Sequence, residues 1–144
     1  MNSGLTIFYT DDDRDDLEFF REIVDMIDDS VEVVTLNDGH ELIEALRNPP
    51  PTPHCVFLDI NMPGMTGFDA LQQVRNSDQH KELPVVMFST SGDERTIERS
   101  RELGASLYVQ KSGVFEQLKS SIEHALKINW STFRTTDQNF LYTA

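Results

Sequence analysis

The side chains of this sequence that could carry out chemistry stand directly after short apolar runs. They are Asp11 and Asp12, Asp59, Ser89 and Lys111. If these runs end at one edge of a sheet, three carboxylates, a hydroxyl and an ammonium group converge there. Clustered carboxylates repel one another unless a cation joins them, and a hard ion such as Mg²⁺ supplies that charge. An aspartate in such a cluster can attack a phosphoryl donor and form an acyl phosphate, while the lysine and the serine bind the other oxygens.

Each of these residues has a simpler explanation when it is taken alone. Aspartate is common in turns, so Asp59 by itself could only cap the turn after its strand. The acidic residues near the first run could only favour the N-terminus of a helix, and we accept that explanation for Asp13, Asp15 and Asp16. A surface cation and a turn hydroxyl would account for the lysine and the serine. Their joint position after four strands is what indicates a site.

The elements that must position these side chains are five strands alternating with five helices. We expect the strands at residues 5–9, 31–35, 56–58, 84–88 and 107–110. Between them, apolar residues recur at three- and four-residue steps, as at Leu17, Phe20 and Val24, which predicts helices. The helix at residues 93–103 is mostly charged, and its few apolar contacts predict a mobile element. This order predicts a doubly wound α/β domain whose parallel sheet is covered on both faces.

The composition excludes several classes of function. Acidic residues number 25 against 12 basic ones, for a formal net charge of −13. Such a surface repels phosphate backbones, so we expect no direct nucleic-acid binding. No apolar run reaches membrane-spanning length, so no membrane insertion is expected. The N-terminus lacks signal-peptide features, and the single cysteine, Cys55, is expected to be a buried, inert thiol. A cytoplasmic location follows as an expectation.

In this order and spacing, the motifs resemble a response regulator receiver domain of two-component signalling. The resemblance spans about Leu5 to Leu126. It rests on the aspartate pair, the phrase Leu-Asp-Ile-Asn-Met-Pro-Gly-Met-Thr-Gly at residues 58–67, the hydroxyl after the fourth strand and the lysine after the fifth. Each motif alone is weak, but the combination is highly specific. It implies a flavodoxin-like (βα)5 fold with a five-stranded sheet in the order 2-1-3-4-5.

The resemblance also implies a phosphoacceptor and a metal site. Asp59 would accept the phosphoryl group. A Mg²⁺ cofactor would be bound directly by Asp12, by Asp59 and by the backbone carbonyl of Asn61, and through water by Asp11. Beyond its own phosphorylation and dephosphorylation, the resemblance implies no enzymatic turnover.

A switch is implied by the same resemblance. Lys111 would contact the phosphoryl group, and Ser89 would be the switch hydroxyl that moves toward it. Tyr108 would be the aromatic switch residue that fills the vacated space. Two departures stand out: Ser89 replaces the commoner threonine but keeps the hydroxyl, and Ser112 stands where the family usually has a proline, commonly after a cis bond.

The implied partners are proteins. A sensor histidine kinase or phosphotransfer protein would donate the phosphoryl group. A downstream protein would bind the face formed by the helix at 93–103, the last strand and the last helix. The same face could also form a homodimer. Residues 1–127 would be the receiver domain, and residues 128–144 a short tail without an output domain, which suggests a stand-alone receiver. We expect the tail aromatics to pack back on the domain, although a partner or dimer contact is the alternative.

Three other functions are compatible with parts of the pattern. A phosphohydrolase of the haloacid dehalogenase type also uses a strand-end aspartate, but Asn61 stands where that chemistry needs a second carboxylate. A binding module with the same fold would need no phosphorylation, which the intact site residues argue against. A flavin-binding protein of similar topology would be coloured when purified.

Overall fold

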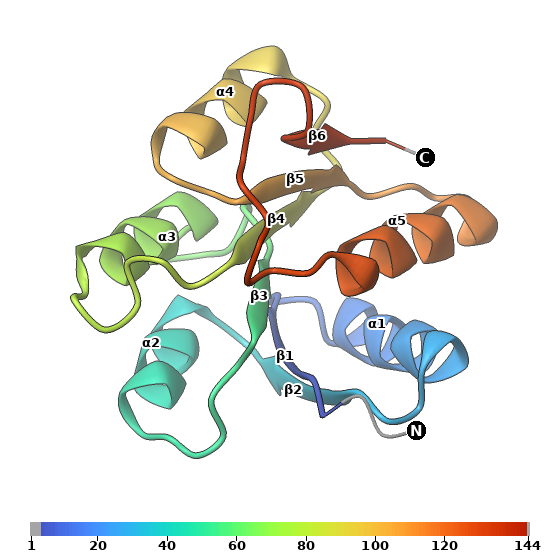
Figure 1. The fold of residues 1–144 in the computed structure, drawn as a ribbon, viewed down its shortest axis with the longest axis horizontal. Coiled ribbons are helices and arrows are strands. Elements are labelled where there is room, and N and C mark those ends of the chain that lie inside the picture. Colours follow the sequence, from blue (N-terminus) through green and yellow to red (C-terminus); the bar gives the residue numbers. More distant parts are fainter. Residues whose placement is uncertain (1–3, 144) are drawn as a thin grey trace.

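A computed structural model describes residues 4–143. Residues 1–3 of the expected receiver domain and residue 144 of the expected tail lie outside the described residues. The elements follow one another as predicted, with a strand and a helix in alternation (Figure 1). In chain order they are β1 (Thr6–Thr10), α1 (Arg14–Ile27), β2 (Glu32–Leu36), α2 (Gly39–Arg47), β3 (Cys55–Leu58), α3 (Gly67–Asn76), β4 (Val85–Ser89), α4 (Glu94–Glu102), β5 (Leu107–Gln110), α5 (Phe115–Lys127) and β6 (Leu141–Tyr142).

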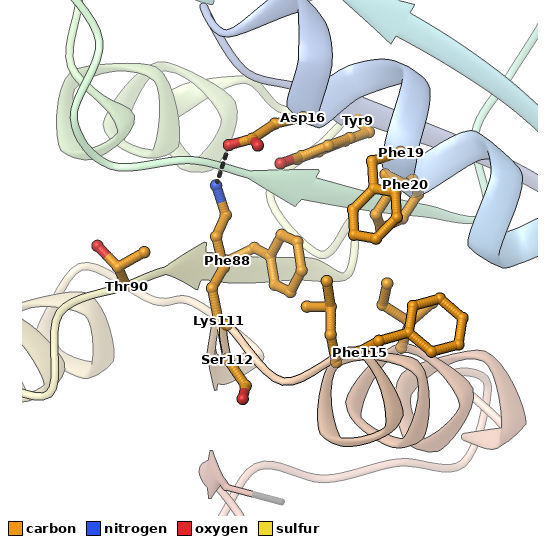
Figure 2. A pocket seen from close by; sticks show the side chains of 12 residues that line it. Tyr9, Asp16, Phe19, Phe20, Phe88, Thr90, Lys111, Ser112 and Phe115 are labelled. Carbon is orange, nitrogen blue, oxygen red and sulfur yellow. Dashed lines mark hydrogen bonds and ion pairs between the residues drawn. The ribbon is translucent and has the colours of Figure 1, made fainter.

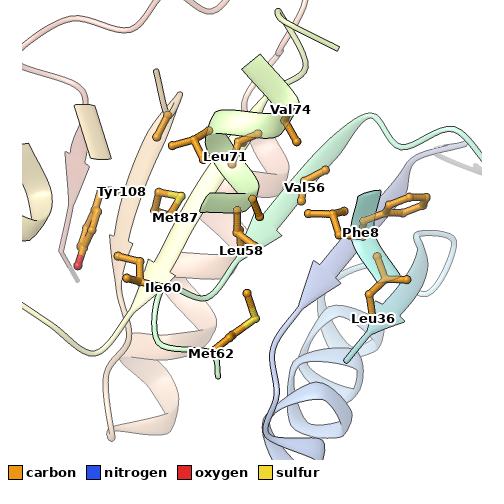
Figure 3. Close-up of a cluster of buried hydrophobic side chains, with 14 of the residues drawn as sticks. Phe8, Leu36, Val56, Leu58, Ile60, Met62, Leu71, Val74, Met87 and Tyr108 are labelled. Atoms are coloured by element: carbon orange, nitrogen blue, oxygen red, sulfur yellow. The ribbon is translucent and has the colours of Figure 1, made fainter. Parts of the chain in front are cut away.

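The sheet has a hydrophobic core on each face because successive strand residues point to opposite sides. Helices α1 and α5 cover one face, while α2, α3 and α4 lie on the other (Figure 1). Phe8, Leu58 and Tyr108 belong to the core under the second group of helices (Figure 3). Their neighbours Tyr9 and Phe57 belong to the core under α1 and α5. The predicted doubly wound architecture is therefore confirmed.

The sheet contains six strands, so the expected count of five is wrong. The strand order is β2-β1-β3-β4-β5-β6, which extends the predicted order 2-1-3-4-5 by one strand from the tail. Leu141 pairs with Tyr108, and Tyr142 pairs with Val109, both in parallel register. A strand of two residues is too short to show any periodicity, which is why the sequence did not reveal it.

Several helices begin at side-chain caps, and the cap of α1 lies among the acidic residues that the sequence analysis assigns to that helix terminus. Asp13 accepts hydrogen bonds from the backbone amides of Asp15 at 2.9 Å and Asp16 at 3.2 Å. Asp38 caps α2 by accepting from the amide of Glu41 at 2.8 Å. Such caps satisfy backbone amides that have no partner within the helix. They fix the point at which each loop at the carboxyl edge of the sheet becomes a helix.

Helix α4 has the sparse packing that its charged sequence predicts. Ser100 is its only buried residue, while Ile97 and the capping residue Leu103 are partly buried against the core. Its mobility stays a prediction. Cys55 is fully buried, and burial raises the pKa of its thiol, as expected for an inert cysteine. Within residues 4–143 no helix is both long and apolar enough to cross a membrane.

Candidate functional site at the carboxyl ends of the strands

The parallel sheet brings the four predicted motifs to one edge. The backbone amide of Asp59 donates to the carbonyl of Thr10 at 3.0 Å, so the end of β3 lies beside the end of β1. The amide of Lys111 donates to the carbonyl of Ser89 at 2.7 Å, which holds the ends of β5 and β4 together in the same way. The order of the central strands then places both pairs in one row at the carboxyl edge.

Three carboxylates gather at this edge. One oxygen from each of Asp11, Asp12 and Asp59 lies within 4.8 Å of the others. Asp11 is 1% exposed and Asp59 is 8% exposed, whereas Asp12 faces solvent. Three acidic oxygens at this spacing are a donor set that suits a hard divalent cation, and the exposed Asp12 leaves the cluster open to solvent. The donor set therefore fits the predicted Mg²⁺.

Lys111 supplies the positive charge among these carboxylates. Its Nζ lies 2.9 Å from Oδ2 of Asp11 and 3.7 Å from Oδ1 of Asp59. It also lies 3.5 Å from Oδ2 of Asp16, which projects from the first turn of α1 (Figure 2). The sequence indicates only a helix-terminal role for Asp16. The structure adds an ion pair with Lys111, which no spacing in the sequence signals because the partners are 95 residues apart.

Tyr9 is a second residue that the sequence did not identify. Its hydroxyl donates to Oδ2 of Asp11 at 2.5 Å, and the backbone amide of Asp13 donates to Oδ1 of Asp11 at 3.0 Å. Burial and the neighbouring Asp11 carboxylate both raise the pKa of Tyr9, so the hydroxyl stays protonated as a donor. Both oxygens of Asp11 thus have protein partners. The only sequence signal was a polar group within a buried apolar strand.

The electrostatics of the cluster favour a bound cation. The pKa of Asp59 is raised to about 6, chiefly by burial, while Lys111 lowers it and Asp11 and Asp12 contribute to the rise. Burial alone would lower the pKa of Lys111, but Asp59 and Asp11 raise it above its ordinary value. The single ammonium therefore compensates three carboxylates only in part. A divalent ion would remove the remaining repulsion.

The predicted switch residues lie next to the site and are joined by hydrogen bonds. Ser89 is fully buried, and its Oγ accepts from the backbone amide of Ser91 at 3.2 Å. The hydroxyl of Tyr108 donates to the carbonyl of the same Ser91 at 2.8 Å. Ser91 therefore links the hydroxyl at the end of β4 to the aromatic ring in β5. Tyr108 is buried in this structure.

Ser112, which stands where a proline is usual in the family, makes hydrogen bonds at the start of α5. In the described chain, cis peptide bonds occur at Pro49–Pro50 and Pro50–Pro51, so the bond between Lys111 and Ser112 is trans. The Oγ of Ser112 accepts from the amide of Val114 at 3.0 Å and donates to Oε1 of Gln117 at 2.7 Å. These bonds connect Ser112 to the cap and the first turns of α5.

The loop after Asp59 depends on a glycine. A Cβ at Gly67 would lie 2.3 Å from the carbonyl oxygen of Asp59 and 2.7 Å from Cα of Ile60. The Gly67 amide donates to the carbonyl of Ile60 at 2.8 Å, which closes the loop on the start of α3. Asn61 lies on this loop and is exposed. Its role as a carbonyl ligand stays a prediction.

Comparison with known proteins agrees with this arrangement. The family model described as "Response regulator receiver domain" matches residues 7–123. The response regulator Rcp1 of Synechocystis sp. is 25% identical over 127 residues, which cover 85% of this chain and 86% of Rcp1. The crystal structure of the phosphorylated cyanobacterial phytochrome response regulator RcpA has a TM-score of 0.77 and 29% identity, and the match covers 91% of this chain and 96% of RcpA. The Mn²⁺-bound form of Rcp1 has the same fold, with a TM-score of 0.77 at 23% identity over 92% of this chain and 99% of that one.

The chain belongs to the response regulator receiver domain family of two-component signalling. Its fold is the flavodoxin-like receiver fold with one additional strand.

Proposed function

We propose that this protein is a phosphorylated switch in which Asp59 accepts a phosphoryl group from a phosphohistidine of a sensor kinase or phosphotransfer protein. The observation that carries the proposal is the buried Asp59 carboxylate, which shares one cluster with Asp11 and Asp12 and lies 3.7 Å from the Lys111 ammonium. The phosphorylated state of RcpA, a relative of similar fold, supports the same chemistry.

The proposed reaction uses Asp59 as the nucleophile. One Asp59 oxygen attacks the phosphorus, so that an O–P bond forms while the N–P bond to the donor imidazole breaks. The imidazole leaves with the electron pair of that bond, as neutral imidazole when its other ring nitrogen already carries a proton, and otherwise it takes up one proton from solvent. Lys111 would bind one of the three oxygens that move with the phosphorus, because its ammonium already lies at this edge. Charge compensation of this kind is the main source of catalysis in phosphoryl transfer.

The metal site would be built from the acidic cluster. Asp12, Asp59 and the carbonyl of Asn61 would hold Mg²⁺, with Asp11 bound through water because both of its oxygens accept protein hydrogen bonds. When bound, Mg²⁺ supplies the positive charge that the transferring group needs. Tyr9 and the Asp13 amide orient Asp11, and Lys111 compensates part of the carboxylate charge before the donor arrives.

The output is a change of protein surface rather than a turnover reaction. We propose that phosphorylation alters the face of α4, β5 and α5, which a downstream protein reads, and that the protein works in the cytoplasm without binding nucleic acid directly. The acidic net charge of −13 supports protein partners over phosphate backbones.

The test is intact mass after incubation with Mg²⁺ and the small-molecule donor acetyl phosphate. We expect one added phosphoryl group on the wild type and none on Asp59→Asn. The matched control is Asp15→Asn, which removes an exposed carboxylate from the first turn of α1 outside the cluster and should leave the addition intact. Chelating the metal should abolish the addition.

Two results would contradict the proposal. Absence of any adduct on the folded wild type would favour a module that acts without phosphorylation. Steady release of phosphate from an ester substrate would favour a phosphohydrolase, although Asn61 lacks the carboxylate that such an enzyme needs.

A further inference from the structure

The tail of this chain covers the face of α4, β5 and α5, on which the proposed switch would be read. The carbonyl of Phe140 accepts a hydrogen bond from the backbone amide of Tyr108 at 2.8 Å, just before β6 joins the edge of β5. The two rings are 6.4 Å apart between centroids, and Phe140 is 4% exposed. Figure 1 shows β6 beside β5 on the outer edge of the sheet, with α4 and α5 on either side. The tail is thus an intramolecular occupant of this face.

The tail is anchored to every element of that face. Asp137 lies 3.6 Å from a guanidinium nitrogen of Arg101, whose guanidinium carbon lies 5.7 Å from the Phe140 ring centroid. The Thr135 hydroxyl donates to the carbonyl of Ser106 at 2.8 Å, at the start of β5. Tyr142 stacks on His124 of α5 with ring centroids 4.1 Å apart. These contacts define the docked tail, residues 135–142.

The docked tail is also connected to the phosphorylation site. Ser89 at the end of β4 is bonded to the amide of Ser91, and the carbonyl of Ser91 is bonded to the Tyr108 hydroxyl. Tyr108 is in turn bonded to Phe140 through its backbone amide. A displacement of Ser89 therefore moves the acceptor of Tyr108, and Tyr108 lies directly under the tail.

The strength of the docking suits a reversible contact. The ion pair of Arg101 and Asp137 is largely exposed, with Asp137 at 94%, so it contributes little. Most of the stabilisation comes from burying Phe140 and from a short set of backbone bonds. Helix α4, which supplies one side of the contact, is itself sparsely packed. Segments with few buried contacts unfold locally at a small cost in free energy.

We propose that the docked tail is a built-in ligand of the α4–β5–α5 face that phosphorylation of Asp59 releases. The released face offers the free edge of β5 and the site of Phe140 to a partner that presents an extended segment with an aromatic residue, since that is the chemistry of the tail itself. The inference rests on the proposed function. Because coupling between two sites is reciprocal, a docked tail must weaken phosphoryl binding by the factor by which phosphorylation weakens docking.

The first test is hydrogen exchange of the wild-type protein with and without Mg²⁺ and beryllofluoride, a stable mimic of the phosphoryl group. We expect the amides of the docked tail and of Tyr108 to exchange about 5-fold faster or more in the mimic-bound state. Asp59→Asn should show no change. Unchanged or slower exchange in a protein that demonstrably takes up phosphoryl by intact mass would overturn the tail proposal and leave the proposed function standing. Failure of uptake would count against the proposed function instead.

The second test measures the reverse direction of the coupling. Phe140→Ala should release the tail and raise the affinity for beryllofluoride by about 5-fold or more. The matched control is Phe133→Ala, which removes a tail aromatic that packs on Trp130 with centroids 5.1 Å apart, outside the docked tail. Equal affinities in wild type and a folded Phe140→Ala variant would contradict the proposal. If that variant fails to fold, the exchange measurement on the wild type decides.

Discussion

Asp59 combines burial with a charge that its protein neighbours compensate only in part. Its pKa is raised to about 6, chiefly by burial, with contributions in the same direction from the carboxylates of Asp11 and Asp12. Lys111 must be shared among Asp59, Asp11 and Asp16, and it contacts Asp11 most closely. The free protein therefore holds Asp59 in a state that is costly in the absence of further positive charge. That cost favours binding of a cation and reaction with a phosphoryl donor.

The first prediction concerns the pH dependence of stability without metal. The pKa of Asp59 is higher in the folded than in the unfolded protein, so the folded state binds more protons between about pH 4 and pH 6. Above about pH 6, the ionised Asp59 therefore lowers the free energy of unfolding of the metal-free protein by its full amount. This loss of stability disappears as the pH falls toward 4. Asp59→Asn should raise the free energy of unfolding by about 1–2 kcal/mol at neutral pH, after allowance for solvent screening and the lost Lys111 pair.

Urea denaturation of wild type and Asp59→Asn in a chelator checks this expectation at neutral and at acidic pH. The difference between the proteins should shrink on acidification. Saturating Mg²⁺ should stabilise the wild type more than the variant. A variant that is less stable than the wild type at neutral pH would show that Lys111 compensates the site fully.

The loop between β3 and α3 shows how an element constrains the site. Its position is set by the contact of Gly67 with the backbone of Asp59 and Ile60, where no Cβ fits. On the other side, Thr66 begins α3 with a reciprocal cap in which it accepts from the amide of Asp69 at 3.2 Å while Asp69 accepts from the amide of Thr66 at 3.1 Å. The loop is thus fixed at both ends. The glycine at the end of the motif is needed for the backbone geometry of Asp59 and Ile60.

The second prediction is that Gly67→Ala disrupts this loop. The added methyl group must displace backbone atoms rather than a flexible side chain, so we expect a loss of about 2 kcal/mol or more in unfolding free energy. Gly113→Ala is the matched control, because a Cβ there meets no atom within 4 Å. The melting temperature and the extent of phosphorylation by acetyl phosphate should both fall in Gly67→Ala and should both be retained in Gly113→Ala. Equal melting of the two variants would contradict the close contact.

For the whole molecule, the sixth strand makes the tail part of the receiver. Phe140 joins the core on the α3 side of the sheet, while Trp130 and Tyr142 pack against the core on the α1 side. The expectation that the tail aromatics pack back on the domain is confirmed for these three residues. The face formed by α4, β5 and α5 is consequently not a bare surface in this structure.

The third prediction follows from that packing. Removing residues 134–144 should lower the free energy of unfolding by about 2–4 kcal/mol, because it exposes Tyr108, loses the burial of Phe140 and leaves backbone groups of β5 unpaired. Urea denaturation measures the change. Leu141→Ala, at a side chain that is 43% exposed, should cost far less. A truncated protein as stable as the full chain would show that the tail is not docked in solution.

The fold and the centre of the site were readable from local patterns. Apolar runs that end at Asp59, Ser89 and Lys111 define strands, and parallel strands must bring their carboxyl ends to one edge. Caps such as Asp38 depend on neighbours three residues away, so the sequence contains the whole interaction. Interactions of this kind need no knowledge of distant segments.

Tertiary structure alone decided the contacts made between segments remote in the chain. The bond from Lys111 to Asp11 joins residues 100 positions apart, and the approach of Asp16 to Lys111 needs α1 to dock beside the end of β5. The sixth strand forms because an exposed edge of β5 and a buried site for Phe140 both exist once the sheet is assembled. Two residues without periodicity carry no strand signal of their own, so only the completed edge could specify that pairing.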